Sequence, residues 1–206
     1  MAFHTTNSAQ ELPAVNQILQ SCGQAPVTSL DQTNPDVAIA YSTLIQVSQE
    51  VQAEGWTYNI EYDYEFIPDT NNEIPIPNNI LQIDPAPEYT TMDVVRRSGK
   101  LYDKVKHSYN FTEKIKCDVV WLFDWVDLPL PIQDYIVART ATIVSSRIVG
   151  DPTQFQMLGQ KEAYNRAMAI EYECNQGDYT YFGHPRGSNS YISYKPYHAL
   201  YSEWQQ

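Results

Sequence analysis

Residues 1–95 of this 206-residue chain contain no lysine and no arginine, although they carry 13 acidic residues. Residues 96–116 reverse the balance with seven basic and two acidic residues, and the net charge of the whole chain is −12. Because the phosphate backbone repels an acidic surface, this distribution argues against a protein that binds nucleic acid broadly. A basic segment that follows a long acidic one favours contact with another copy of the chain.

Long apolar runs are also missing, and cysteine is scarce. The longest run, residues 119–123, is far shorter than the ~20 residues that span a bilayer, so no membrane contact is expected. The N-terminus lacks the basic and apolar regions of a signal peptide. The three cysteines, Cys22, Cys117 and Cys174, have no C-x-x-C spacing, which predicts reduced thiols in a protein made in a cytoplasm.

The sequence lacks the usual motifs of several kinds of chemistry. It has no G-x-S-x-G for acyl transfer, and it has neither a P-loop nor a G-x-G-x-x-G for nucleotide binding. Its four histidines and three cysteines show no zinc-ligand spacing. We therefore expect no cofactor, no metal and no enzymatic activity.

One acidic stretch is a candidate site. In "EGWTYNIEYDYEFIP", residues 54–68, the even positions from Trp56 to Phe66 are apolar or aromatic. Three odd positions are acidic: Glu61, Asp63 and Glu65. Side chains alternate faces along a strand, so the pattern predicts a strand with one carboxylate face. Their spacing of ~7 Å would permit an inverting glycosidase pair, but polar-out alternation is ordinary in half-buried antiparallel strands, and we favour a solvated face.

Helical periodicity appears in two pairs of segments. The first helix begins at Ser8 or at Leu12 and ends at Gly23, and the second runs from Pro35 to Glu54. A third runs from Pro131 to about Val149, and a fourth starts at Pro152. The predicted core stripe of the fourth helix is Phe155, Leu158, Ala163, Ala167, Ile170 and Cys174.

These elements predict an α+β fold. A four-helix bundle is built from the N- and C-terminal helix pairs, residues 1–55 and 129–177, with an inserted antiparallel β region at residues 56–128. Within the β region we expect strands at 92–97, 100–105 and 117–125. Five prolines between residues 67 and 91 exclude a central strand there.

The last segment, residues 178–206, is rich in aromatic residues and poor in aliphatic ones. Such a composition favours an extended C-terminal arm that folds on a partner. Its candidate binding residues are Tyr179, Tyr181, Phe182, Tyr191, Tyr194, Tyr197, Tyr201 and Trp204.

The N-terminal third of the chain resembles a known family. "ELPAVNQILQSCGQAPV", residues 11–27, fits the pattern E-L-x-A-V-N-x-I-L-x-S-x-G-x-x-P-V, and residues 55–59 fit G-W-T-[FY]-N. Both patterns are similar to those of tail tubular protein A, the tail adaptor of short-tailed, podovirus-type bacteriophages. The resemblance is specific over residues 11–69 and continues loosely into the third and fourth helices.

The resemblance implies a structural virion protein that is made in the host cytoplasm. It would form a twelvefold ring between the portal protein and the tail nozzle protein, tail tubular protein B, with a tail fibre protein attached near the junction. Phage DNA would pass through the ring without specific binding. The charge pattern suggests where copies meet: Arg96, Arg97, Lys100 and Lys104 of one copy facing an acidic surface that includes Glu61, Asp63 and Glu65. Two alternatives remain open, namely an adaptor-type protein with glycan-hydrolase activity and a carbohydrate- or peptide-binding module.

Overall fold

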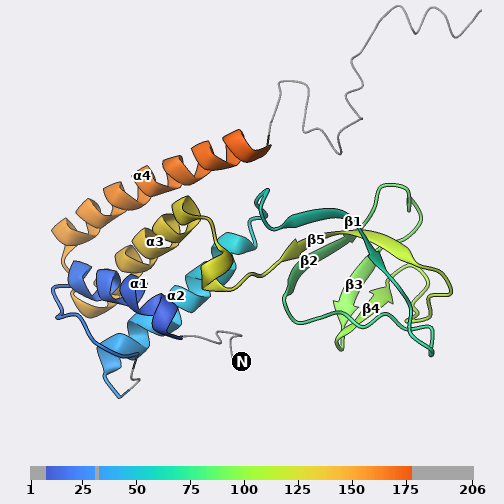
Figure 1. Cartoon of the computed structure of the whole chain (residues 1–206), viewed down its shortest axis with the longest axis horizontal. Helices are drawn as coiled ribbons and strands as arrows, with labels where there is room; N and C mark the ends of the chain where they lie inside the picture. Colours follow the sequence, from blue (N-terminus) through green and yellow to red (C-terminus); the bar gives the residue numbers. More distant parts are fainter. Residues whose placement is uncertain (1–7, 31–32, 178–206) are drawn as a thin grey trace, which may run out of the picture.

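The computed structural model describes residues 8–30 and 33–177. Figure 1 shows the helices gathered in one lobe and the strands in another, with α4 along the outer edge of the helical lobe. The helical lobe comprises α1 (Ser8–Ser21), α2 (Pro35–Gln52), α3 (Leu130–Ile148) and α4 (Pro152–Gly177). The β lobe comprises β1 (Ile60–Phe66), β2 (Ile80–Pro85), β3 (Val94–Arg97), β4 (Lys100–Asp103) and β5 (Ile115–Trp121). A short 3-10 helix, η1 (Trp125–Asp127), leads back to α3. The α+β class is confirmed.

The ends of α1 and α2 follow from their sequence. Helix α1 starts at Ser8 and not at Leu12, because Pro13 costs one hydrogen bond without ending the helix. Gly23 has φ +76 and closes a Schellman motif, in which the amide of Gln24 donates to the carbonyl of Leu19 at 2.9 Å. At the start of α2, the side chain of Asn34 accepts a hydrogen bond from the amide of Asp36, as its capping position predicts.

Helix α3 lies at the centre of the helical lobe. It is buried on several sides and packs against α1, α2 and α4. Helices α1, α2 and α3 also pack on one another, whereas α4 packs mainly on α3 as the second half of a helical hairpin. The described residues therefore form a three-helix core with α4 outside it, and the predicted four-helix bundle arrangement is not confirmed.

The predicted core stripe of α4 is wrong. Phe155, Ala163, Ala167, Ile170 and Cys174 are exposed, and Ala169 is the buried residue at the centre of the helix. The side of α4 that meets α3 is mostly polar, so hydrophobic periodicity pointed to the opposite face.

The β lobe has a three-stranded antiparallel sheet in the order β1-β5-β2 and a β3–β4 hairpin. The hairpin matches the predicted strands, and Ser98 and Gly99 both have positive φ, as a tight two-residue turn requires. The predicted strand at 117–125 is shifted, because β5 ends at Trp121. Strand β2 was missed, but it is an edge strand that ends at Pro85, which agrees with the exclusion of a central strand.

Strand β1 differs from the prediction in two ways. It starts at Ile60, since residues 57–59 form a turn. Its register against β5 then shifts between Glu61 and Tyr64, where Asp63 has φ +57. Such a bulge moves every later side chain to the other face.

Each lobe has its own hydrophobic core. In the helical lobe the core includes Val15, Leu44, Trp56 and Ile136, and in the β lobe it includes Phe66, Leu101 and Val119. Trp56 and Tyr58 pack on the helical core, so they lie outside the strand that the alternation predicted.

Candidate assembly surfaces

The G-W-T-Y-N segment builds the junction between the two lobes. Gly55 has φ +77 and turns the chain out of α2, and the indole of Trp56 donates to the carbonyl of Val51 at 2.7 Å. The fully buried Asn59 satisfies three backbone groups. Its Nδ2 donates to the carbonyls of Gln52 at 2.9 Å and Trp121 at 2.8 Å, and its Oδ1 accepts from the amide of Trp56 at 2.8 Å. One side chain therefore joins α2, the turn and β5.

A second amide side chain supports the same junction. Gln52 is fully buried, and its side chain pairs with both backbone groups of Phe123, donating at 3.1 Å and accepting at 2.8 Å. The two bonds fix the segment that follows β5 against the end of α2. Since both sides of the junction are closed by buried hydrogen bonds, we expect the two lobes to move as one body.

Another family motif residue holds the first loop. Asn16 on α1 donates to the carbonyl of Val27 at 2.9 Å and accepts from its amide at 2.7 Å. Val27 in turn packs on the helical core. The asparagines of the two motifs thus both hold backbone segments in place.

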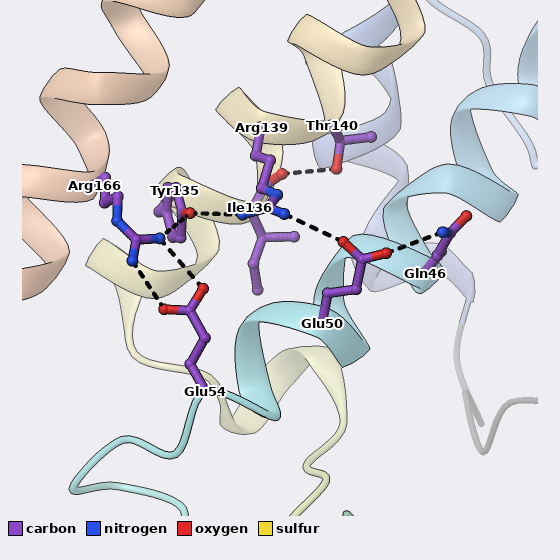
Figure 2. Close-up of polar contacts among 8 residues, drawn as sticks. All are labelled: Gln46, Glu50, Glu54, Tyr135, Ile136, Arg139, Thr140 and Arg166. Carbon is purple, nitrogen blue, oxygen red and sulfur yellow. Dashed lines mark hydrogen bonds and ion pairs between the residues drawn. The ribbon is translucent and has the colours of Figure 1, made fainter.

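A polar network ties α4 to the rest of the helical lobe (Figure 2). Arg166 forms a bidentate ion pair with Glu54, at 3.3 and 3.1 Å, and also donates to the hydroxyl of the buried Tyr135. Arg139 donates to the same hydroxyl at 3.1 Å and pairs with Glu50 at 3.4 Å. The neighbouring carboxylate and hydroxyl raise the pKa of both guanidinium groups.

The C-terminal end of α4 is fixed in the same way. Both carboxylate oxygens of Glu173 accept from the amide of Thr57 at 3.0 Å, and one accepts from its hydroxyl at 2.6 Å. Asn165 donates to the carbonyl of Asp134 at 3.1 Å. Glu173 and Thr57 are 116 residues apart in the sequence, so no local sequence pattern could have predicted their contact.

The outer side of α4 exposes many apolar side chains among polar ones. The apolar members are Phe155, Met157, Ala163, Tyr164, Ala167, Met168, Ile170 and Cys174, and the polar members include Gln156, Gln160, Lys161, Glu171, Asn175 and Gln176. We call this surface the outer face of α4. Met157 is 67% exposed and Tyr164 is 65% exposed. Met157, Tyr164 and Met168 follow one line along the helix, and Ala163, Ala167, Ile170 and Cys174 follow a parallel one. Large exposed apolar surfaces of this kind mark contact sites.

The three acids of β1 do not share one face. Glu61 is paired with Val119 of β5, whereas Glu65 is paired with Lys116, and residues 116 and 119 point to opposite faces of a regular strand. All three acids, Glu61, Asp63 and Glu65, are exposed. Lys114 donates to Glu65 at 2.9 Å and lowers the pKa of that carboxyl, whereas a general acid needs a raised pKa. The three acids therefore do not form the predicted carboxylate stripe, but the prediction that they are exposed to solvent is confirmed.

The basic segment, residues 96–116, covers most of the β3–β4 hairpin, the loop after it and the start of β5. Lys100 pairs with Glu73, and Lys104 pairs with Asp93. Arg97 lies over the ring of Tyr102 at 4.1 Å from its centroid, and Arg96 donates to Asn78. The lobe thus neutralises much of this positive charge internally. That the hairpin meets a neighbouring subunit stays a prediction.

The aromatic arm, residues 178–206, lies outside the described residues. Within residues 8–30 and 33–177, no group of three or more His, Cys, Asp or Glu side chains is arranged to hold a metal ion. In the same part of the chain, no helix combines the length and the apolar character that crossing a membrane demands.

Comparison with known proteins agrees with these features. The family model described as tail tubular protein matches residues 12–179. Tail tubular protein A of Klebsiella phage KP34 is 26% identical to the chain over 168 residues, which cover 81% of this chain and 89% of the relative. The matched region contains the first motif except Glu11, the whole second motif, nearly all of both lobes and the whole of α4. The chain therefore belongs to the tail tubular protein family and is a structural protein of bacteriophage tails.

Proposed function

We propose that the protein is a tail adaptor, of which twelve copies form a ring that joins the portal protein to the nozzle protein, tail tubular protein B. The observation that carries the proposal is the apolar surface left exposed on both lobes, from Tyr64 and Ile67 beside the sheet to Met157 and Tyr164 on α4. A head-to-tail ring needs two different patches on each subunit, and an exposed patch on each lobe meets that need.

The charge supports passage of DNA through such a ring. A chain with a net charge of −12 repels the phosphate backbone, so DNA would slide through an acidic lumen without binding. A tail fibre protein would attach near the junction of ring and nozzle. Synthesis would take place in the host cytoplasm, with the finished protein in the virion tail.

Imaging tests the ring. Negative-stain microscopy of the purified full chain, alone and mixed with portal protein, should show closed rings with twelvefold symmetry. Particles the size of a single subunit in both samples would contradict the proposal.

The basic hairpin is a proposed part of the subunit contact. Replacing Lys100 and Lys104 with glutamate should weaken ring assembly, and added salt should weaken assembly of the unaltered protein, since exposed ion pairs are screened. Analytical ultracentrifugation at low and high salt measures both effects. Because Lys100 and Lys104 also pair within the lobe, thermal unfolding of the variant is the control. Assembly that responds to neither change would exclude the hairpin from the contact.

The arm at residues 178–206 is proposed to dock on the portal, with a neighbouring subunit as the second choice. Tyrosine and tryptophan supply large contact area with a polar group, which interfaces favour. A chain without this segment should stay folded and lose co-purification with the portal protein. Unchanged affinity for the portal would show that docking lies elsewhere.

The enzyme and binding-module alternatives have less support. Glu61 and Glu65 lie on opposite faces of the sheet, so they cannot act as a pair on one glycosidic bond. The match to the tail tubular protein family extends through both lobes, whereas we would not expect a free-standing binding module to match a tail protein over most of its length.

A further inference from the structure

We propose that the outer face of α4 is the surface on which a second copy of this chain docks. The inference rests on the ring proposed above and assigns one side of its subunit contact to a named helix. Its evidence is that the inward side chains of α4 are mostly polar, while several of its large apolar side chains are exposed.

Helix α4 does not need its apolar side to stay attached to its own subunit. Its inward side chains are held by the Arg166–Glu54 ion pair, by the bonds of Glu173 to Thr57 and by the bond of Asn165 to a carbonyl of α3. Ala169 is the one fully buried apolar side chain at this contact within the described part of α4. Among the described residues, the large apolar side chains of the outer face therefore stay exposed, which is typical of a contact surface.

Electrostatics favours a second copy as the occupant. Two chains of charge −12 repel each other, so copies meet most easily where the local charges are opposite or near zero. On α4 the exposed charged residues are Lys161 and Glu171, which cancel, while Glu162, Arg166 and Glu173 are half-buried toward α3. The face is thus almost neutral on an acidic protein. It also lacks the clustered positive charge that DNA would require.

The dimensions suit a subunit contact. A helix of 26 residues is roughly 39 Å long and about 10 Å wide with its side chains. Its outer side projects an area on the order of 400 Å², which is about half of the ~800 Å² that each partner contributes to a standard interface. A ring contact that includes α4 and part of the β lobe would reach that size.

The exposed thiol of Cys174 provides a test that needs no substitution. Cys22 and Cys117 are buried, and Cys174 lies on the outer face of α4. Reaction of the full chain with a maleimide should modify Cys174 quickly in the dilute monomer. It should be at least about tenfold slower in the isolated ring, because a thiol must be accessible to react. Mass spectrometry of the peptides identifies the modified residue.

A matched pair of double variants gives the second measurement. Met157→Glu with Tyr164→Glu places charge on the face and should weaken assembly by about 30-fold or more. Met157→Leu with Tyr164→Phe keeps the face apolar and should assemble normally. Both pairs change exposed side chains, so circular dichroism of the monomers should be unaltered.

The outcomes separate this inference from the ring itself. If the unaltered protein forms rings while Cys174 stays as reactive as in the monomer, or if the glutamate variant assembles normally, α4 is not the contact and the ring stands. If Cys174 is already protected in the monomer, the chain covers the face itself and the inference fails. If the unaltered protein does not assemble at any concentration, both proposals fail.

Discussion

Replacing Asn59 with alanine tests whether one buried amide holds the two lobes together. The substitution removes three hydrogen bonds, of 2.8, 2.9 and 2.8 Å, from the amide of Trp56 and the carbonyls of Gln52 and Trp121. The carbonyl of Gln52 still accepts from the amide of Gly55 at 3.2 Å. A buried backbone group without a partner costs roughly 1–3 kcal/mol. Some relaxation will recover part of this, so we expect a loss of about 3–5 kcal/mol in the free energy of unfolding. That is a large share of the ~5–15 kcal/mol typical of a folded domain.

Urea unfolding measures the loss. Trp56 and Trp121 lie at the junction, so intrinsic fluorescence should follow its opening. For a loss of this size the midpoint should fall by about 1–2 M urea. The matched control is Asn175→Ala, since Asn175 is exposed on α4 and should leave the midpoint unchanged. A loss below about 1 kcal/mol for Asn59→Ala would refute the role given to the junction.

Three further predictions address single groups. Burial raises the pKa of the Glu11 carboxyl above its ordinary 4.5. Protonated Glu11 therefore contributes stability below pH 4.5, and this stability is lost as the pH rises through the raised pKa. The variant Glu11→Gln should unfold at a higher temperature than the unaltered protein at neutral pH but not in acid. Glu173→Ala should cost about 1–3 kcal/mol and speed hydrogen exchange at the end of α4, whereas Glu171→Ala, at an exposed position, should do neither. Glycan-hydrolysis assays should find no turnover in the unaltered protein; turnover that is abolished by any of three substitutions would refute the structural assignment: Glu61→Gln, Asp63→Asn or Glu65→Gln.

Local signals predicted most of the elements. Asn34 with Pro35, Gly23 and the Ser98-Gly99 turn act through their immediate neighbours, and each lies where its chemistry required. Periodicity also identified the four α-helices, and of the two starts that it left open for α1 the structure has Ser8. Sequence is informative wherever the cause lies within a few residues.

Long-range packing accounts for the failures. The period-two pattern of β1 could not reveal a bulge at Asp63, because the register is set by β5 more than 50 residues away. The apolar stripe of α4 was assigned to the core because most exposed helices bury such a stripe. In this chain the inward contacts are polar and come from Glu54, Thr57 and Tyr135, which are distant in sequence.

The mass of the assembled protein tests the central claim most directly. Native mass spectrometry of the purified full chain should give one dominant species of about 283 kDa, twelve times the chain mass of 23.6 kDa. Addition of portal protein should raise the mass of that species, because portal protein binds to it. A protein that remains at 23.6 kDa at every concentration, with and without portal protein, would contradict the account.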